Sequence, residues 1–417
     1  MKRTTIETIL LVLTTFTFFG LQLLVAEALS SLDASPVRRV VVVGGTHGNE
    51  YTGVWCIKAL ELQKEELRDR YPSMEIETLL ANPQAHLANR RFIDTDLNRE
   101  FQCDTLCIID DDDDIKEKEE NRLSNDDSNT NDGGEELLHE SIEYRRAKEL
   151  DLILGSKCKF GSSDEEDEFD VAIDLHSTTS NMGITLIINE GDHLMTQAAA
   201  FVATHCQPEH EVRILMHSIP ERENRSTLSS AAKHGFTIEV GPVPQGILRH
   251  DAVQKTDAAM HGVLEFLQRI HNREEDTSVG VRDEMRRWSS EAYPTGRVPC
   301  FRTAPARRPG EISGKITWPC DPDNPNFPSL MVHESLQDQD FSLLRVGDPL
   351  FVAPDRSVVY YDGSHGESVY VVFVNEGGYY YASSGTGIGV AVTAEYDLQT
   401  GMLCKEKKLE YEKSNTL

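Results

Sequence analysis

The chain alternates between strand-like and helix-like segments, and this alternation constrains its fold more than any other feature. It begins at "VVVVGGTHGNEYTG", Val40 to Gly53, where a run of β-branched residues predicts a buried strand. Two glycines then permit a tight turn, and the stretch from about Thr52 to Arg70 has the apolar spacing of a helix. The alternation predicts an α/β core, a sheet with flanking helices. Further strands are predicted at 74–83, 169–176, 183–189, 212–217 and 235–241, and helices at 141–154, 196–205 and 251–270.

The last third of the chain has a different texture. After about Glu274, glycine and proline become frequent and helical periodicity disappears. Short β-rich runs such as "PLFVA", "SVVYY" and "SVYVVFVN" recur between turns. We therefore expect two domains, an α/β domain over residues 37–275 and a β-rich domain over residues 280–410.

The N-terminal segment, residues 1–28, has the pattern of a targeting signal. Lys2 and Arg3 precede an apolar run over residues 9–26, and Ala26-Glu27-Ala28 fits a small-x-small cleavage site. The apolar run is also long enough for an uncleaved anchor, and a two-stage organelle presequence would begin in the same way. The sequence thus predicts entry into the secretory pathway or an organelle, with membrane attachment if the segment is not cleaved.

Charge and cysteine content narrow the classes of partner. The formal net charge of −29 argues against non-specific binding to nucleic acid, which requires many Lys and Arg side chains. Part of this charge is local, because residues 108–137 contain two blocks of acids without apolar periodicity and are expected to form a disordered insertion. Alternatively, this insertion could be an acidic arm that binds calcium or a basic partner. The eight cysteines lack the paired spacing of a zinc ribbon. The protein could also form a homo-oligomer.

Three residues could hold a metal ion. His47 and Glu50 stand three apart at the turn after the first strand, where neighbouring glycines let both side chains face one point. His176 is the last residue of the predicted strand 169–176, and ligands bind outside the carboxyl ends of strands in open α/β sheets. Two histidines and a carboxylate suit a catalytic zinc, which keeps its fourth position open. Asp174 could orient a histidine or could satisfy backbone N–H groups at the end of its strand.

Further polar residues stand in places that suggest catalysis. Glu239 interrupts an apolar strand, and a carboxylate there is costly unless something uses it. It could be paired with an arginine, but beside a zinc it would be a general base and acid. The stretch "ANRRFIDTDLNREF" concentrates Arg90, Arg91, Asn98 and Arg99, which suggests an anionic substrate.

Eight motifs occur in order over about Val37 to Tyr381: "GGTHGNE", "ANPQA", "RRFIDTDLNR", "DLHSTTSNMG", "IEVGPVPQGILR", "LQDQDF", "GDPLF" and "VFVNEGGYY". Taken together, they resemble aspartoacylase and its near relatives. The resemblance implies a zinc-carboxypeptidase-like mixed sheet with flanking helices, plus a C-terminal β-rich domain that caps the site. It also implies one zinc ion per chain and hydrolysis of the amide bond of small N-acyl amino acids, N-acetylaspartate or related.

The resemblance assigns a role to individual residues. His47, Glu50 and His176 would hold the zinc, Glu239 would be the general base and acid, and Arg91 would polarise the scissile carbonyl. Asn98 and Arg99 would bind the amino-acid carboxylate, and Tyr379 would reach into the site from the β-rich domain.

One position departs from the family pattern. Aspartoacylase carries an arginine for the aspartate side chain ten residues before the catalytic glutamate, and Ser229 stands there in this chain. Arg222 or Arg225 could substitute if the loop is re-registered. An aminoacylase for neutral or aromatic N-acyl amino acids is therefore the alternative. A metallocarboxypeptidase or a non-catalytic binding protein on the same fold fits the sequence less well.

Overall fold

The computed structural model describes residues 37–106, 141–155, 157, 168–206, 210–219, 221–275, 279–321, 323–381 and 386–404. Contacts divide the chain into two units, Met1–Val37 and Arg38–Leu417, and the fold described below is that of the second unit. The expected targeting segment, residues 1–28, and the expected acidic insertion, residues 108–137, lie outside the described residues. Of the helices that are described, none is long and apolar enough to cross a membrane.

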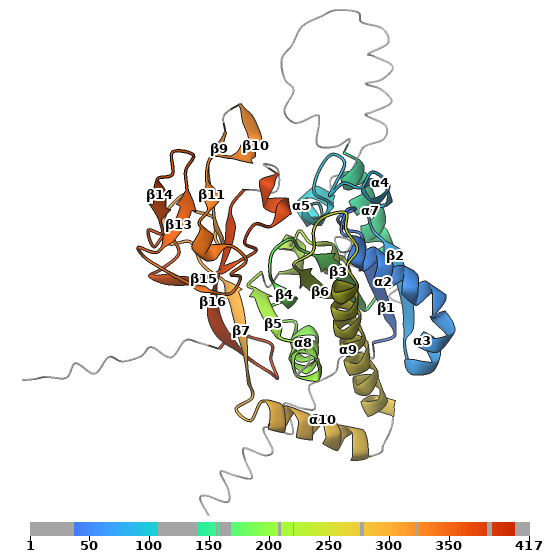
Figure 1. Cartoon of the computed structure of the whole chain (residues 1–417). Helices are drawn as coiled ribbons and strands as arrows, with labels where there is room; N and C mark the ends of the chain where they lie inside the picture. The colour runs from blue at the N-terminus through green and yellow to red at the C-terminus, as the bar shows by residue number, and fades with distance from the viewer. Residues whose placement is uncertain are drawn as a thin grey trace, which may run out of the picture. The chain divides into compact units, whose positions relative to one another are not determined.

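Within the described residues, 11 strands form one mixed sheet (Figure 1). The strand order is β12-β15-β16-β7-β5-β4-β6-β3-β1-β2, and β8 pairs with β16. β1 is parallel to β2 and β3, β3 is parallel to β6, and β4 is antiparallel to β6. The carboxyl ends of β1, β3 and β6 therefore meet at one edge of the sheet. The bounds of the first six strands are Arg39–Gly44, Glu75–Leu80, Val171–Ser177, Gly183–Asn189, Val212–His217 and His234–Gly241 for β1 to β6.

Helices cover both faces of this part of the sheet. On one face α9 (His250–Glu275) packs on both α2 (Tyr51–Leu62) and α8 (His193–His205), and all three pack on the strands (Figure 1). On the other face α7 (Ile142–Leu154) shares a core with Val41 and Val43 of β1. Because side chains alternate along a strand, Val40 and Val42 point to the opposite face. The valine run of β1 is buried on both faces, as the sequence predicted.

The predicted helix 52–70 and strand 74–83 differ from the structure in their bounds. The helix is two helices, α2 and α3 (Lys64–Arg70), which meet at Gln63. β2 ends at Leu80, and Pro83 begins α4 (Pro83–Leu87) instead of ending the strand. The Asn82 side chain accepts a hydrogen bond from Ala85 N at 3.2 Å, and proline is favourable at the first helical position. The cap therefore turns the chain into a helix before the predicted end of the strand.

The prediction that helical structure ends near Glu274 was wrong. α9 runs to Glu275, and α10 (Val279–Ala292) follows it. α10 packs through few apolar side chains: Met285 is buried, and Trp288 contacts Phe201 with ring centroids 5.4 Å apart. Charged residues between these contacts make the apolar stripe too sparse to be recognised as helical periodicity.

The β-rich region has its own apolar core, which includes Trp318, Phe351 and Val371. It is joined to the α/β sheet, because β5 and β7 pair at Leu215–Phe301 and Met216–Arg302. The domain limits 37–275 and 280–410 remain a prediction, but the two regions share one sheet. The elements are β7 (Arg297–Thr303), β8 (Lys315–Ile316), β9 (Cys320–Asp321), β10 (Asn324–Pro328), β11 (Met331–Val332), η5 (Glu334–Leu336), β12 (Leu343–Arg345), β13 (Pro349–Val352), β14 (Val358–Tyr360), β15 (Ser368–Val372), η6 (Gly377–Tyr380) and β16 (Ile388–Asp397).

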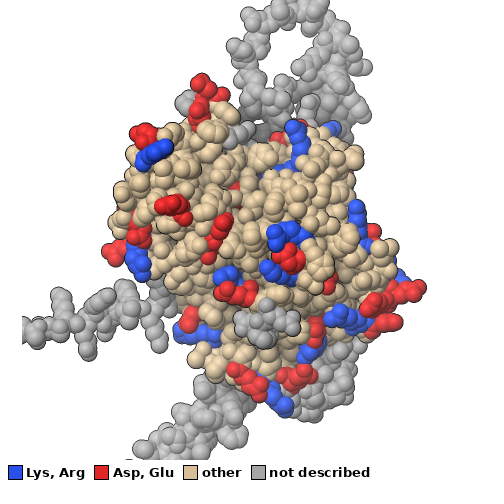
Figure 2. All heavy atoms as spheres, viewed as in Figure 1, with Lys and Arg blue, Asp and Glu red and all other residues tan. Residues whose placement is uncertain are grey.

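Acidic and basic side chains are interspersed on the face shown in Figure 2. Ion pairs between nearby residues of the chain include Arg249–Asp251 at 2.8 Å and Arg213–Glu211 at 2.7 Å. The expectation that the protein does not bind nucleic acid stays a prediction.

Candidate active site

The turn between β1 and α2 presents His47 and Glu50 to one point. Gly45 has a φ of +70°, which glycine adopts without strain. Gly48 packs on the backbone of α4, where an added Cβ would lie 2.1 Å from the carbonyl carbon of Ala85. Glu50 N donates to the carbonyl of His47 at 3.1 Å and closes the turn. The glycines thus let the turn pack closely against α4, and in this position the His47 and Glu50 side chains face the carboxyl edge of the sheet.

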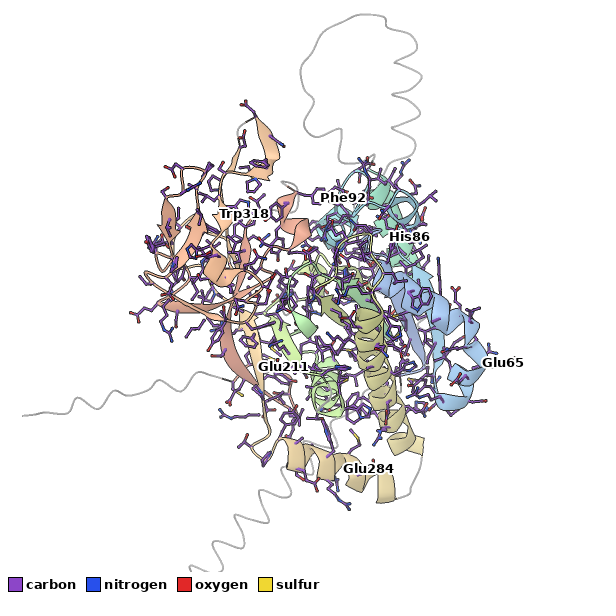
Figure 3. The ribbon with its side chains drawn as sticks, viewed as in Figure 1. Glu65, His86, Phe92, Glu211, Glu284 and Trp318 are labelled. Carbon is purple, nitrogen blue, oxygen red and sulfur yellow. The ribbon has the colours of Figure 1, made fainter. Side chains whose placement is uncertain are left out.

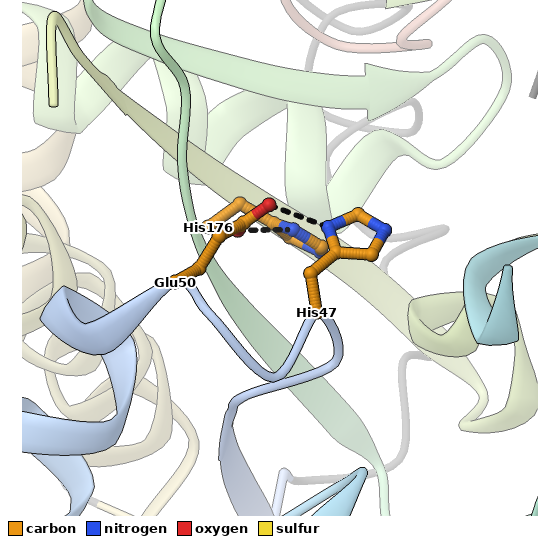
Figure 4. Close-up of side chains that lie close together, drawn as sticks. All are labelled: His47, Glu50 and His176. Atoms are coloured by element: carbon orange, nitrogen blue, oxygen red, sulfur yellow. Dashed lines mark hydrogen bonds and ion pairs between the residues drawn. The ribbon is translucent and has the colours of Figure 1, made fainter. Parts of the chain in front are cut away.

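The structure brings His47, Glu50 and His176 together at this edge. His176 lies on β3, the parallel neighbour of β1, so its side chain reaches the same point as the turn. His47 Nδ1 lies 2.6 Å from Glu50 Oε1, and His176 Nδ1 lies 3.0 Å from Glu50 Oε2 (Figure 4). All three side chains are buried, and one ligand atom from each lies within 4.8 Å of the others. The group could hold a metal ion.

Two aspartates contact the other nitrogens of these histidines. His47 Nε2 lies 3.0 Å from Asp96 Oδ1, and His176 Nε2 lies 2.9 Å from Asp174 Oδ2. Thr46 Oγ1 donates to the second oxygen of Asp174 at 2.7 Å. Each imidazole therefore has an acceptor carboxylate at both of its ring nitrogens. With a cation between the Nδ1 atoms and Glu50, the Nε2 protons would be donated to the two aspartates. Of the two interpretations of Asp174, the geometry supports the one in which it orients a histidine.

Glu239 lies on β6 directly beside His176 of β3 and is buried. Burial raises the pKa of Glu239 well above its ordinary value; His176 and Arg91 oppose this shift, while Glu50 and Glu376 add to it. A carboxyl group with a raised pKa can both take and release a proton near neutral pH. The same burial would raise the pKa of Glu50, but the two histidines outweigh it and hold that pKa below its ordinary value.

Arg91 is buried between the turn that carries Glu50 and the β-rich region. Its Nε and Nη2 donate to Asp96 Oδ2 at 3.3 and 3.1 Å. Its Nη1 lies 3.4 Å from Glu50 Oε1 and 3.7 Å from Glu376 Oε1. Gly378 leaves room for the guanidinium, because an added Cβ there would lie 2.7 Å from Arg91 Cζ. The cation is thereby held beside the His47–Glu50–His176 group.

Asn98 and Arg99 lie on η1 (Leu97–Arg99), close in sequence to Arg91. Asn98 Oδ1 accepts from Leu228 N at 2.9 Å, which directs the Asn98 amide nitrogen to the other side. Arg99 is exposed and donates to the carbonyl of Asn98 at 2.8 Å. Tyr379 comes from η6, and burial raises its pKa to about 12, with Arg99 and Arg91 opposing the shift. The structure therefore brings Tyr379 into the electrostatic range of both arginines.

One carboxylate, Glu376, ties η6 to the loop after His176. Its Oε2 accepts from Thr178 Oγ1 and from Thr179 N, the latter at 3.1 Å. Its Oε1 accepts from Gly378 N at 2.8 Å and faces Arg91. The bonds to Thr178 and Thr179 join residues 198 and 197 positions apart in the chain.

Aromatic contacts hold the same segment from two sides. Tyr381 packs on Phe92, with ring centroids 5.1 Å apart, and Tyr380 packs on Trp318 at 5.4 Å. Figure 3 labels Phe92 in the α/β region and Trp318 in the β-rich region. η6 is therefore fixed by packing as well as by Glu376.

Sequence reasoning named neither Asp96 nor Glu376. Asp96 belongs to the "RRFIDTDLNR" motif, whose cations suggest an anionic substrate, and Glu376 belongs to "NEGGYY", in which the resemblance assigns a role only to the tyrosine. The motifs were the available signal, but only the fold shows that Asp96 meets His47 across 49 positions of sequence.

Comparison with known proteins agrees with this geometry. Residues 36–267 match the succinylglutamate desuccinylase/aspartoacylase catalytic domain, and residues 311–388 match the AstE/AspA barrel-sandwich hybrid domain. A probable aspartoacylase of Nostoc sp. is 31% identical over 344 residues, which cover 82% of this chain and 93% of that protein. An N-acyl-aromatic-L-amino acid amidohydrolase (carboxylate-forming) A of Danio rerio is 32% identical over 342 residues, which cover 82% of this chain and 85% of that protein.

A solved structure shares the fold over most of its length. Murine aminoacylase 3 superposes with a TM-score of 0.64 at 26% sequence identity, covering 87% of this chain and 98% of that one. The family match extends over more than half of the chain, from the first strand to α9. The chain therefore belongs to the succinylglutamate desuccinylase/aspartoacylase family.

Proposed function

We propose that this protein is a zinc-dependent deacylase that hydrolyses N-acyl amino acids, N-acetylaspartate or related, to a carboxylate and a free amino acid. One observation carries the proposal: the Nδ1 atoms of two buried histidines face one carboxylate, Glu50, and Glu239 lies on the adjoining strand. A cation-binding group next to a proton-transferring carboxyl is the minimum that amide hydrolysis by a metalloenzyme requires. The named activities of the relatives support the same class of reaction.

The donor set fits zinc, one ion per chain. Catalytic zinc is commonly held by two histidines and one glutamate, with the fourth position open. His47, Glu50 and His176 would be the ligands, and Asp96 and Asp174 would orient the two imidazoles. When bound, zinc supplies Lewis acidity toward the amide carbonyl and toward water.

Glu239 would carry the proton. Its carboxylate would take a proton from the attacking water, whose oxygen forms the new bond to the acyl carbon. Its carboxyl group would then give that proton to the amide nitrogen as the carbon–nitrogen bond breaks. The raised pKa supports both steps, because the group has to be protonated and deprotonated within one cycle.

The cations and Tyr379 would position the substrate. Arg91, held by Asp96 beside Glu50, would donate to the carbonyl oxygen as negative charge develops on it. The Asn98 amide nitrogen and the Arg99 guanidinium would bind the α-carboxylate. Tyr379 would close the site from the side of the β-rich region.

The test is a panel of N-acetyl amino acids and unblocked dipeptides incubated with zinc-replete protein, with released free amino acid measured. We expect hydrolysis of the N-acetyl compounds and no comparable hydrolysis of the dipeptides. Preferred dipeptide cleavage would indicate a metallocarboxypeptidase instead, and the absence of any hydrolysis would indicate a binding protein on this fold.

A second candidate is an aminoacylase for neutral or aromatic N-acyl amino acids. The observation that favours it is Ser229, a buried serine at the position where the resemblance implies an arginine. N-acetylphenylalanine and N-acetylleucine in the same panel distinguish the two, because the second candidate would prefer them to N-acetylaspartate.

We also propose that residues 1–28 direct the protein to the secretory pathway or an organelle, and that they anchor it if they are retained. Cys103 forms a disulfide, a bond that persists mainly in oxidising compartments, and this supports the proposal. N-terminal sequencing of the mature protein, together with cell fractionation, tests both parts.

A further inference from the structure

A lysine of the β-rich region lies against the tyrosine of the site. Lys315 is on β8, where it pairs with Gly389 of β16. Its Nζ lies 3.5 Å from the centroid of the Tyr379 ring, within the range of a cation–π contact. Gly387 makes room for the side chain, because an added Cβ there would lie 2.8 Å from Lys315 Cγ.

Lys315 also shares its electrostatic surroundings with the arginines of the site. Burial, together with the positive charges of Arg99 and Arg91, lowers the pKa of Lys315 to about 8. The same two arginines act on Tyr379. Lys315 thus contacts the tyrosine on which the charges of both arginines act, and an anion bound near the three cations would offset their mutual repulsion.

The loop that carries Ser229 contains two arginines, each of which donates to the backbone of that loop. Ser229 occupies the expected position, buried beside Thr237, whose Oγ1 donates to Ser229 Oγ at 3.4 Å. Arg222 Nε donates to the carbonyl of Ser230 and Arg225 Nε to that of Ile219, both at 2.8 Å. Both arginines therefore hold the backbone of their own loop, whereas Lys315 contacts Tyr379 and lies within electrostatic range of Arg91 and Arg99.

We propose that Lys315 is a specificity-determining residue that binds a second carboxylate of the substrate, one beyond the α-carboxylate held by Asn98 and Arg99. This inference rests on the proposed deacylase function and refines it, because the preferred substrates become N-acyl amino acids with two carboxylates. The second carboxylate could belong to the amino-acid side chain or to the far end of the acyl group. An ammonium recognises both in the same way.

The experiment compares substrates that differ only in this carboxylate. N-acetylaspartate is paired with N-acetylasparagine, and N-succinylalanine with N-butyrylalanine. We measure kcat/KM for the wild type, Lys315→Met, Lys315→Arg and the exposed-lysine control Lys58→Met, after verifying that zinc content and thermal midpoint match. For one pair, Lys315→Met should lower kcat/KM about 10- to 100-fold on the dicarboxylate and less than about threefold on the substrate that lacks the second carboxylate. Lys315→Arg should restore most of the loss, and the affected pair identifies which carboxylate is bound.

Three results would overturn the proposal: equal losses on both members of each pair, no loss on either, or a wild type that does not prefer a dicarboxylate. In the last case hydrolysis of the neutral substrates would leave the deacylase function standing. If the zinc-loaded wild type hydrolyses none of the four, the proposed function itself fails. In that case calorimetry decides the role of Lys315. The Kd of L-aspartate is compared with that of L-asparagine, and the Kd of succinate with that of succinamate, for the wild type and for Lys315→Met. A dicarboxylate Kd unchanged by Lys315→Met would exclude that role.

Discussion

The site combines two regions that are held in different ways. At the carboxyl edge of the sheet, each histidine has its own aspartate, His47 with Asp96 and His176 with Asp174, and all four side chains are buried. The β-rich region instead reaches the site through η6, which is tied by Glu376 and by aromatic packing. The difference suggests that the sheet edge supplies the chemistry and the β-rich region supplies substrate selection. Changes at the edge should then affect every substrate, and changes in the β-rich region should affect binding more than turnover.

The largest effect is expected from His176→Ala. The change removes one of three metal ligands, and because loss of even an orienting residue commonly costs about 10- to 100-fold in metal affinity, the loss here should exceed that. Metal analysis after dialysis should find little zinc, and hydrolysis should fall for every substrate. The exposed histidine change His250→Ala is the control. Full zinc content in His176→Ala would mean that the three residues are not the metal site.

Glu239→Gln should affect turnover without affecting zinc. Glutamine has the shape of glutamate but cannot carry the proton, and general acid–base catalysis is typically worth about 10²- to 10⁴-fold in rate. Steady-state kcat should fall by that amount for all substrates, while zinc content and thermal midpoint stay at wild-type values. Turnover near the wild-type rate would show that Glu239 is structural.

Glu376→Gln tests the region that reaches the site from outside the α/β sheet. The charge that accepts from Thr179 N and Gly378 N is lost, and each charge-assisted hydrogen bond is worth about 1.5–3 kcal/mol. We expect kcat/KM to fall by about 10- to 100-fold, more through KM than through kcat, with zinc retained. Glu367→Gln, the same change at an exposed glutamate, is the control and should leave kcat/KM unchanged. A loss confined to kcat would contradict the separation of chemistry from selection.

The smallest effect is expected from deletion of residues 110–131 within the predicted acidic insertion. Lengthening or shortening a flexible surface loop changes the closure free energy by only about 0.6 kcal/mol per doubling of length. Activity should stay within about twofold of wild type, and the thermal midpoint should be nearly unchanged. Loss of activity would mean that the insertion belongs to the site and that the two regions described above are not its only parts.

Local patterns made much of the fold predictable. β4 and β5 coincide with the predicted strands 183–189 and 212–217, because each is an apolar run between turn residues. His47 and Glu50 follow β1, and His176 lies near the carboxyl end of β3, so their convergence required only that β1 and β3 be parallel neighbours.

Contacts between distant segments were not predictable in the same way. The pairing of Glu376 with Thr178 depends on how η6 packs against the loop after β3, and no spacing in the sequence encodes that packing. α10 was missed because tertiary contacts, such as the bond from Trp288 Nε1 to Thr204 Oγ1, support a helix with few apolar residues. The contact between Lys315 and Tyr379 likewise depends on how β8 packs beside η6, so the sequence does not predict it.

Zinc titration of chelator-treated protein tests the central claim most directly. Free amino acid released from N-acetylaspartate, N-acetylalanine and N-acetylphenylalanine would be followed as zinc is added, with bound zinc measured in parallel. The account predicts that hydrolysis of whichever of these the protein accepts rises linearly and stops rising at one zinc per chain. Full hydrolysis by the metal-free protein, or zinc bound at one per chain without hydrolysis of any of them, would contradict it.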